Sequence, residues 1–202
     1  MLKLYHAPKT RSVRVMWLLE ELGLDYAVHK LAFSPEALKS EEYLKINPMG
    51  RVPAIEDDGI CMFESGAIVQ YILEKYGEGR LEPKVGTPER AKFLQWMHFA
   101  EGQAMSPFSD IFQHSMILPA DERVPEIAKK GREKSADVLD VLEKALEGKT
   151  WLCGEEFTAA DIMVGYVVFS AKMLGLINDK LPNLKAYWDR IKDRPAFQKA
   201  AA

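Results

Sequence analysis

Short apolar runs and helical periods alternate over the first 80 residues. Residues 2–5 and 26–31 are apolar runs of strand length. Between them, four apolar positions follow the i, i+3, i+4, i+7 spacing of one helix face: Val15, Leu18, Leu19 and Leu22. Gly23 is expected to end that helix. This alternation of strand and helix predicts an α/β layer.

Turn and proline signals predict the rest of this layer. Pro35 opens an amphipathic segment that stops before Pro48, because the residue before a proline disfavours helix. Two apolar runs flank Asp57-Asp58-Gly59, a hairpin signal, and predict paired strands. A helix over residues 64–76 closes the unit. The predicted order is β-α-β-α-β-β-α.

The segment of residues 77–88 is dense in Gly and Pro and has no helix or strand period, so it predicts a linker between domains. The chain beyond it is helical in pattern, and Pro107 is expected to bend or end the first long helix. The sequence thus predicts an α/β domain over residues 1–80 and an all-helical domain over residues 87–202.

The tetrapeptide Thr158-Ala159-Ala160-Asp161 precedes an apolar run and fits a capping box, with Asp in place of the usual Glu. In this motif the Thr hydroxyl accepts from the amide of the third residue, and the carboxylate accepts from the amide of the Thr. We therefore expect Asp161 to serve folding rather than catalysis.

Composition narrows the classes of function. The 27 Lys and Arg against 30 Asp and Glu give a net charge of −3, which argues against a nucleic-acid binder because such a protein needs a basic face. Charged residues interrupt the apolar stretches of the N-terminus, which therefore predicts neither a signal peptide nor a membrane span. A cytoplasmic protein with a small-molecule ligand is the expectation.

The two cysteines, Cys61 and Cys153, lack the CxxC or Cys/His spacing of a metal or redox site. Cys61 sits in an apolar run, where a small buried hydrophobic residue is the favoured interpretation over a reactive thiol. Neither cysteine is expected to be a nucleophile, and no metal is expected.

Three motifs occur in order along the chain: Asn47-Pro48-Met49-Gly50-Arg51-Val52-Pro53, Phe63-Glu64-Ser65 and Phe157-Thr158-Ala159-Ala160-Asp161. Their combination resembles the cytosolic glutathione transferases of the bacterial type, with a serine- or threonine-type active site. The resemblance covers essentially the whole chain. It implies a thioredoxin-like α/β N-terminal domain, an all-α C-terminal domain, glutathione as co-substrate, a small hydrophobic electrophile as second substrate, and a homodimer.

Val52 and Pro53 are implied to bind the cysteinyl segment of glutathione. A cis bond between them would turn the Val52 amide and carbonyl outward, where an extended peptide can pair with them like an added strand. The spacing alone leaves open that Pro53 merely starts an edge strand.

Glu64 and Ser65 open the predicted helix over residues 64–76, where unpaired amides and the positive dipole end attract a carboxylate. The Ser65 hydroxyl adds a donor and Glu64 a counter-charge, so the pair suits the zwitterionic γ-glutamyl end of glutathione. The alternative is N-capping by an acidic first turn. The resemblance assigns the cations Arg51 and Lys39 to the glycyl carboxylate.

The implied reaction requires glutathione as its thiolate, because the thiolate is the nucleophile. The family supplies a hydroxyl or thiol donor near the end of the first strand. Aligned on Arg14-Val15, the serine of many serine-type transferases falls on Thr10, the predicted catalytic donor, with Arg11 adding positive field at the helix start. Ser12 is the runner-up, and its alternative role is to cap the first turn of the helix.

Two other side chains at the end of the first strand are given no catalytic role. Tyr5 is interpreted as structural, because it lies inside the strand and lacks the pattern of tyrosine-type transferases. His6 could act on the substrate, but a hydrogen-bonded surface residue of the turn is the favoured interpretation.

The leading hypothesis is an enzyme in which glutathione thiolate attacks an electrophilic carbon or reduces a peroxide. An isomerase of the maleylacetoacetate type shares the fold, but Lys9-Thr10-Arg11-Ser12 replaces its serine–cysteine motif. A non-catalytic, transferase-like binding or regulatory protein is the alternative from another class, and Val52-Pro53 and Glu64-Ser65 weigh against it. Met62, Phe63 and Phe93 are the expected dimer contacts.

Overall fold

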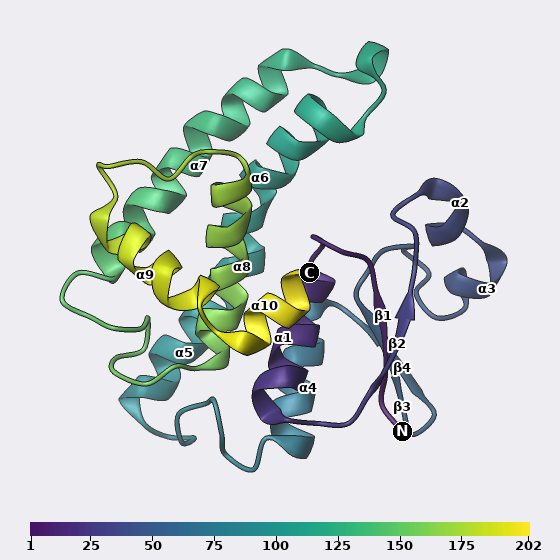
Figure 1. Cartoon of the computed structure of the whole chain (residues 1–202), viewed down its shortest axis with the longest axis horizontal. Helices are drawn as coiled ribbons and strands as arrows, with labels where there is room; N and C mark the ends of the chain where they lie inside the picture. The colour runs from purple at the N-terminus through teal and green to yellow at the C-terminus, as the bar shows by residue number, and fades with distance from the viewer. The chain divides into compact units, whose positions relative to one another are not determined.

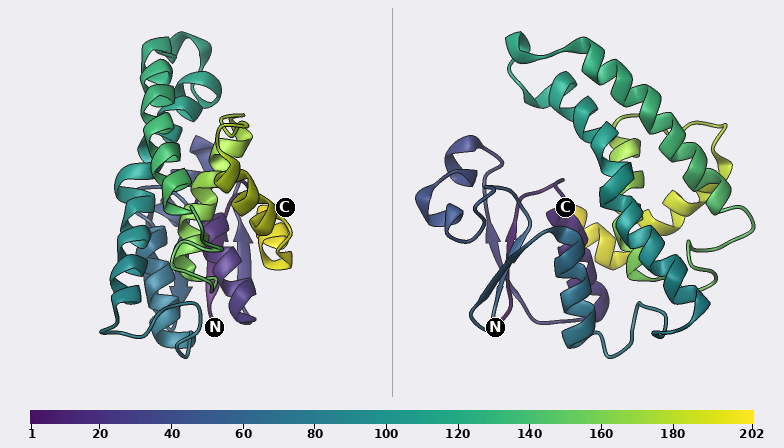
Figure 2. Two further views of the ribbon diagram at one scale, coloured as in Figure 1. Left: turned by 90° about the vertical axis from the view of Figure 1, so that its left-hand side faces the viewer. Right: turned by 180° about the vertical axis from the view of Figure 1, so that it is seen from behind.

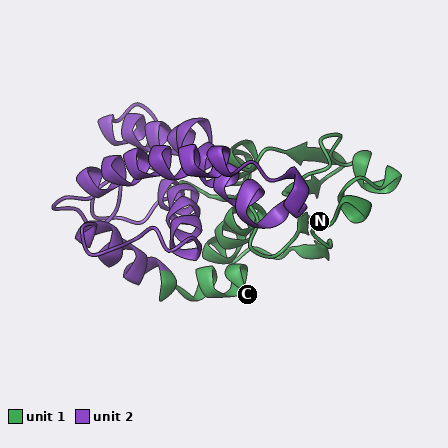
Figure 3. Ribbon diagram, turned by 90° about the horizontal axis from the view of Figure 1, so that it is seen from above, with its two compact units in different colours: residues 1–82, 192–202 green, residues 83–191 purple.

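The structure, a computed structural model, describes residues 1–202 and divides them into two compact units (Figure 3). Unit 1 comprises Met1–Glu82 and Lys192–Ala202, and unit 2 comprises Pro83–Ile191. The predicted fold class is confirmed: unit 1 is α/β and unit 2 is helical. The C-terminal residues differ from the expectation, because 192–202 belong to unit 1 rather than to the helical unit.

The elements of unit 1 follow the predicted order with one correction. They are β1 (Lys3–His6), α1 (Ser12–Leu22), β2 (Ala27–Lys30), α2 (Pro35–Leu38), α3 (Glu41–Leu44), β3 (Ala54–Asp57), β4 (Ile60–Phe63), α4 (Ser65–Tyr76) and α10 (Pro195–Ala201). The amphipathic segment after Pro35 was expected as one helix and is two. Ser40 is extended between them, and its Oγ accepts from the Tyr43 amide and so begins α3 as an N-cap.

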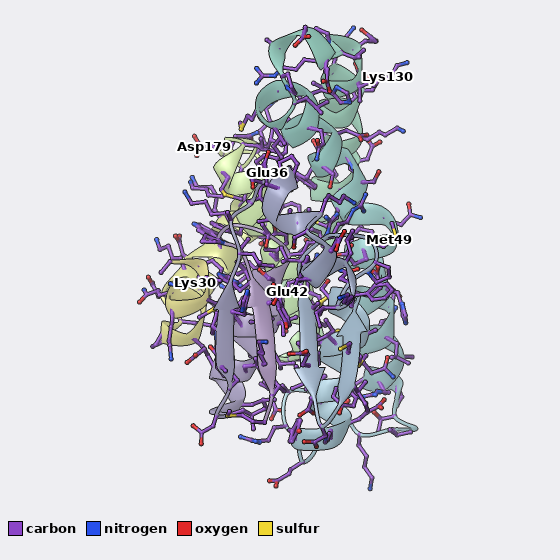
Figure 4. The ribbon with its side chains drawn as sticks, turned by 90° about the vertical axis from the view of Figure 1, so that its right-hand side faces the viewer. Lys30, Glu36, Glu42, Met49, Lys130 and Asp179 are labelled. Atoms are coloured by element: carbon purple, nitrogen blue, oxygen red, sulfur yellow. The ribbon has the colours of Figure 1, made fainter.

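The four strands form one mixed sheet in the order β2-β1-β3-β4. β1 runs parallel to β2 and antiparallel to β3, and β3 and β4 form the predicted hairpin. Asp58 and Gly59 both have positive φ, 48° and 83°, as a type I′ hairpin turn requires. In Figure 4, which looks onto one face of the sheet, the strands lie side by side, and Glu42 of α3 and Met49 project on the viewer's side.

Helices α1 and α4 lie side by side on one face of the sheet (Figures 1 and 2). Fully buried side chains from these helices and from the strands form the core: Leu4, Trp17, Leu18, Leu19, Ile55, Ile68 and Ile72. α10 packs against α1, where the rings of Trp17 and Phe197 meet at 4.9 Å. Arg194 adds two hydrogen bonds to the Glu21 carboxylate, at 2.6 and 2.7 Å, which explains why the C-terminus belongs to unit 1.

Unit 2 consists of helices joined by turns and loops. They are α5 (Pro88–Phe99), the π turn η1 (Ala100–Ala104), α6 (Met105–Phe112), the π turn η2 (Gln113–Ile117), the 3-10 turn η3 (Ala120–Glu122), α7 (Pro125–Ala145), α8 (Ala159–Met173) and α9 (Pro182–Lys192). Pro107 does not end a helix, because it lies inside α6. The helix changes to the wider π pattern just before Pro107, which offers a place for its missing N–H donor to be accommodated.

α8 is the buried centre of unit 2, and the predicted capping box at its start is confirmed. Asp161 is fully buried, and its carboxylate accepts from the amides of Leu152 and Thr158 and from the hydroxyls of Thr158 and Tyr187. The residue therefore joins the start of α8 to the preceding loop and to α9.

The prediction for Cys61 was wrong, because this side chain is exposed. β4 is one of the two outer strands of the sheet, so its apolar run Ile-Cys-Met-Phe has a neighbouring strand on one side alone. None of the helices is long and apolar enough to cross a membrane.

Candidate functional site

The sheet register brings three of the predicted site segments to one end of unit 1. Tyr5 lies opposite Ala54, and Ala54 lies opposite Phe63. The chain therefore leaves β1 and β4 at the same end at which it enters β3. The segments beyond those strand ends carry Thr10 after β1, Val52-Pro53 before β3, and Glu64-Ser65 after β4.

A compact hydrogen-bonded group forms where β1 turns into α1. The Thr10 hydroxyl is half-buried and donates to the Ala7 carbonyl at 2.7 Å. The Ser12 hydroxyl is fully buried and lies 2.8 Å from Thr10 Oγ1 and 2.9 Å from His6 Nδ1. It also accepts from the Ala7 amide at 3.3 Å. Of the two candidate hydroxyls, Thr10 is thus the one with an exposed side.

The expectation for His6 was wrong, because the ring is only 4% exposed and sits under this turn rather than on the surface. Burial lowers the pKa of His6, and the positive charge of Lys30 lowers it further. The ring is therefore neutral near pH 7, with one nitrogen able to accept and one able to donate. Sequence reasoning missed this residue because its partner, Ser12, lies on the next element.

Tyr5 is structural, as interpreted from the sequence. Its hydroxyl donates to Glu56 and accepts from Lys3, at 3.0 and 2.8 Å. Its ring packs against Tyr43 of α3, at 5.4 Å between centroids. These contacts tie strands β1 and β3 together and leave the Tyr5 hydroxyl no part in the group around Thr10.

Two side-chain hydrogen-bond donors hold the loop that precedes β3. The Asn47 side-chain amide and the Tyr43 hydroxyl both donate to the Arg51 carbonyl at 2.6 Å. Burial raises the pKa of Tyr43 to about 12, so this hydroxyl keeps its proton. Gly50 has φ of 58°, and a Cβ there would lie 2.5 Å from the Leu38 carbonyl, so this position requires glycine. Asn47 and Gly50 therefore shape the turn before Val52.

The two predicted carboxylate-binding cations flank this loop. Arg51 is exposed directly before Val52. Lys39 is exposed at the end of α2, and its Nζ donates to the Met49 carbonyl at 2.8 Å. Lys39 thus has one of its three N–H donors engaged with the loop and can direct the others to a ligand.

The bond between Val52 and Pro53 is cis, which confirms that part of the prediction. The Val52 amide and carbonyl make no backbone hydrogen bond within the chain. An unpaired donor and acceptor on one residue beside a sheet can accept an extended peptide as an added strand.

The start of α4 is the third part of the site. Glu64 is exposed at the N-cap position with φ of 75° and does not cap the helix with its side chain. Ser65 is buried, and its hydroxyl accepts from Arg14 Nη1 at 3.1 Å. Because the Ser65 oxygen already accepts this bond, its proton is available to a ligand. The first-turn amides of α4 lack a side-chain cap.

Arg14 is a functional candidate that sequence reasoning missed. Its guanidinium is fully buried on α1 and donates a hydrogen bond to Ser65, so it places a positive charge beside the start of α4. The signal available in the sequence was a charged residue between Val13 and Val15, on a helix whose neighbouring positions are apolar. Arg11, by contrast, is half-buried at the N-cap position of α1, where its charge adds to the positive helix end.

Two cavities lie in unit 2. One, of about 550 Å³, is lined by His114, Ser115, Arg123, Lys129 and Arg132 among others, and the second, of about 450 Å³, lies beside Arg190. None of the predicted glutathione-binding residues lines either cavity.

Comparison with known proteins identifies two matching family models. The model described as glutathione S-transferase, N-terminal domain, matches residues 1–74, and the model described as glutathione S-transferase, C-terminal domain, matches residues 104–195.

Individual proteins are similar along nearly the whole chain. A probable glutathione S-transferase of Oryza sativa subsp. japonica is 34% identical, covering 97% of this chain and 93% of the relative. The disulfide-bond oxidoreductase YfcG of Escherichia coli is 32% identical, covering 99% and 94%. A solved structure of a glutathione transferase homologue from Lodderomyces elongisporus, with two GSH per subunit, superposes with a TM-score of 0.91 at 26% identity and covers 99% and 97% of the two chains.

Proposed function

Because this chain belongs to the glutathione S-transferase family, we propose that it binds glutathione in unit 1 and transfers it as the thiolate to a small hydrophobic electrophile. The observation that carries the assignment of the site is the sheet register. It gathers a hydroxyl, an unpaired peptide group and an uncapped helix start at one end of unit 1. These three features match the thiol, the backbone and the γ-glutamyl end of one extended tripeptide.

The cysteinyl backbone of glutathione pairs with the amide and carbonyl of Val52 in this proposal, next to Pro53. The γ-glutamyl carboxylate receives the Ser65 hydroxyl and the first-turn amides of α4, with the positive end of the helix behind them. Glu64 accepts the γ-glutamyl ammonium. The buried charge of Arg14 supports this end of the ligand through its hydrogen bond to Ser65.

The glycyl carboxylate at the other end of the tripeptide is assigned to Arg51, with Lys39 as a second cation. Both side chains are exposed, so each contributes a modest electrostatic attraction that salt weakens. Arg51 is the stronger candidate, because its guanidinium can bind a carboxylate with two parallel hydrogen bonds.

Thr10 is proposed as the group that stabilises the thiolate. A free thiol of this kind titrates near pKa ~8.5, and lowering it by roughly two units takes about 2.7 kcal/mol. A hydroxyl donor to a charge together with a helix N-terminus is of this order. Ser12 stays the runner-up, and Arg11 adds positive potential at the same helix start.

A thermal-shift experiment tests glutathione binding. A ligand that binds only the folded state raises the melting temperature by mass action, so millimolar glutathione is expected to raise that of the parent protein. Glu64→Ala removes the carboxylate for the ammonium and should abolish most of the shift. Glu74→Ala, which changes another exposed acid of α4, is the matched control and should keep it. No shift in the parent protein favours the non-catalytic, regulatory alternative.

Turnover assays separate the possible reactions. We expect conjugation of an aryl halide, and reduction of a hydroperoxide as a side activity. The reduction of a disulfide substrate by glutathione should be measured in the same assays, because one relative is named a disulfide-bond oxidoreductase. Isomerisation of a maleylacetoacetate-type substrate with none of these activities would support the isomerase alternative.

We also propose a cytoplasmic homodimer that contacts its partner through β4. Phe63 is 37% exposed and Met62 half-buried, so both are accessible to a partner, whereas the expectation for Phe93 was wrong, because Phe93 is buried within this chain. Light scattering at micromolar concentration is expected to give twice the chain mass of 22.9 kDa. A mass of 22.9 kDa contradicts the dimer.

A further inference from the structure

The hydroxyls of Thr10 and Ser12 and the ring of His6 form one chain of polar atoms under the proposed thiol position. Ser12 Oγ lies between the other two, 2.8 Å from Thr10 Oγ1 and 2.9 Å from His6 Nδ1. Either atom of each pair can be the donor, because hydroxyls rotate and neutral imidazole has two tautomers. The direction in which this chain donates is therefore set by what lies at its ends.

In the structure, the proton of Thr10 is directed to the Ala7 carbonyl. A carbonyl oxygen can only accept, so the 2.7 Å contact fixes Thr10 as donor to Ala7. A hydroxyl has a single proton, and a thiolate beside Thr10 must compete with that carbonyl for it. The sulfur carries a full negative charge, and charged acceptors form the stronger hydrogen bonds.

We propose that His6 and Ser12 are positioning residues for the thiolate: His6 Nδ1–H donates to Ser12 Oγ, Ser12 donates to Thr10 Oγ1, and Thr10 donates to the glutathione sulfur. This rests on the proposed glutathione site with Thr10 as its donor. No O–H bond breaks, since the two hydroxyls only rotate and the neutral imidazole holds its proton on Nδ1 in place of Nε2. The proton of the thiol itself leaves to solvent as the thiolate forms.

The count of donors and acceptors supports this direction. Ser12 Oγ would accept from His6 Nδ1–H and from the Ala7 amide, 3.3 Å away, and donate to Thr10. Thr10 Oγ1 would accept from the Ser12 hydroxyl and from the Ser12 amide, also 3.3 Å away, and donate to sulfur. Each hydroxyl then uses its one proton and both acceptor positions. A hydroxyl that accepts hydrogen bonds is a stronger donor, because successive bonds polarise one another.

The competing acceptor for the Ser12 proton is the Ala7 carbonyl, 3.1 Å away. Thr10 Oγ1 is closer, at 2.8 Å, and becomes a better acceptor when its own proton turns to a negative charge. His6 supports the arrangement by its burial, since the ring is 4% exposed and its Nδ1 faces Ser12. A neutral ring in this position can hold the donor tautomer without adding a buried charge.

The test is the thiol pKa of glutathione bound to the full-length protein. It is measured from thiolate absorbance in the parent protein and in variants of the three hydrogen-bonded residues. Thr10→Val deletes the terminal donor and is expected to raise the thiol pKa by about one to two units. Ser12→Ala and His6→Leu leave that donor unsupported and should each raise it by about half a unit. His6→Asn places an amide near the Nδ1 position and should restore the parent value.

Two further measurements separate this role from a structural one. All four variants should bind S-methylglutathione, which has no thiol, with the affinity of the parent. In the Thr10→Val background, His6→Leu should cause no additional rise, because the chain it supports is already broken. Ser12→Ala keeps the test available if the larger change at His6 prevents folding.

The outcomes distinguish the chain of hydrogen bonds from the function on which it rests. An unchanged thiol pKa in Thr10→Val overturns Thr10 as the donor, and the chain with it. A raised value in Thr10→Val with parent values in both Ser12→Ala and His6→Leu overturns the chain and leaves Thr10 in place. A His6→Leu effect that persists in the Thr10→Val background also overturns it, since His6 would then act directly on the sulfur. If His6→Leu weakened the binding of S-methylglutathione as much as the binding of glutathione, His6 would have a structural role alone.

Discussion

Helices α8 and α4 begin with the same problem, backbone amides that have no partner within the helix, and they differ in what accepts from those amides. At α8 the chain supplies the acceptors itself, because Thr158 and Asp161 complete a capping box. At α4 no side chain caps the first turn, although Glu64 stands at the N-cap position. We call the start of α8 closed, because its own side chains cap the first turn, and the start of α4 open, because none does.

The two acidic residues show why position matters more than residue type. Asp161 is the third residue of its helix, fully buried, and receives four hydrogen bonds. Glu64 precedes its helix in a positive-φ conformation, and its side chain makes no cap hydrogen bond to the first-turn amides. A closed helix start contributes to folding, whereas an open one beside exposed polar groups can bind a ligand. This difference teaches that the proposed site is found where the local rules of folding are incompletely satisfied.

The largest expected effect is at the closed start. Asp161→Ala leaves the buried amides of Leu152 and Thr158 without an acceptor and takes the carboxylate from the Tyr187 hydroxyl, so it should lower the free energy of unfolding by roughly 3–5 kcal/mol. Urea denaturation followed by circular dichroism measures this. Thr158→Ser keeps the hydroxyl cap and should remain within about 1 kcal/mol of the parent. A loss below about 1 kcal/mol in Asp161→Ala would contradict its folding role.

The second effect concerns the C-terminal end of α4, which is joined to β3 by hydrogen bonds. The Asp57 carboxylate accepts from Lys75, Tyr76 and Tyr71. Burial alone would raise the pKa of Asp57, but these three donors together hold it below its ordinary value. Asp57→Asn should therefore lower the free energy of unfolding by about 2 kcal/mol at pH 7 and leave glutathione affinity unchanged.

The pH dependence of that difference has a definite sign. A carboxyl with a lowered pKa in the folded state stabilises the protein above its unfolded value, about 3.9, and loses that contribution as the pH falls through the folded value. The parent and Asp57→Asn should therefore converge in urea midpoint as the pH is lowered from about 4 towards 2. If the urea midpoints of the two proteins still differed near pH 2, the loss of stability in Asp57→Asn would come from packing rather than from charge.

The third effect is on binding, at the open start of α4. Ser65→Ala removes a donor to the γ-glutamyl carboxylate and should weaken glutathione binding about tenfold, measured by titration calorimetry. Ser40→Ala is the matched control, because Ser40 caps α3. That control should cost about 1 kcal/mol of stability and leave glutathione affinity unchanged. The reverse pattern would make Ser65 an ordinary cap.

The smallest effect concerns the backbone at the open start. Glu64 holds φ of 75°, a conformation that glycine adopts at little cost and alanine does not. Glu64→Gly should therefore be more stable than Glu64→Ala by about 1 kcal/mol without ligand, measured from their melting temperatures. Both variants should lose the same glutathione-induced shift. Equal stability of the two variants would show that the positive φ is relaxed easily at this position.

The features that the sequence determined by itself depend on residues a few positions apart. The capping box joins Thr158 to Asp161, the hairpin turn uses Asp58-Gly59, and Gly23 ends α1 in the left-handed conformation, all as predicted. The fold class followed from such signals, because hydrophobic period and turn chemistry are read within one element. The motif around Pro53 is also local, and its resemblance to the family predicts that this loop binds glutathione.

The tertiary structure decided which distant residues meet. Arg14 reaches Ser65 across 51 positions, His6 is buried under Ser12, and Cys61 is exposed because β4 is an edge strand. The C-terminal segment joins unit 1 through Arg194 and Glu21, 173 positions apart. No local pattern specifies such pairs, since burial and partner choice depend on how the strands are ordered and which helices cover them.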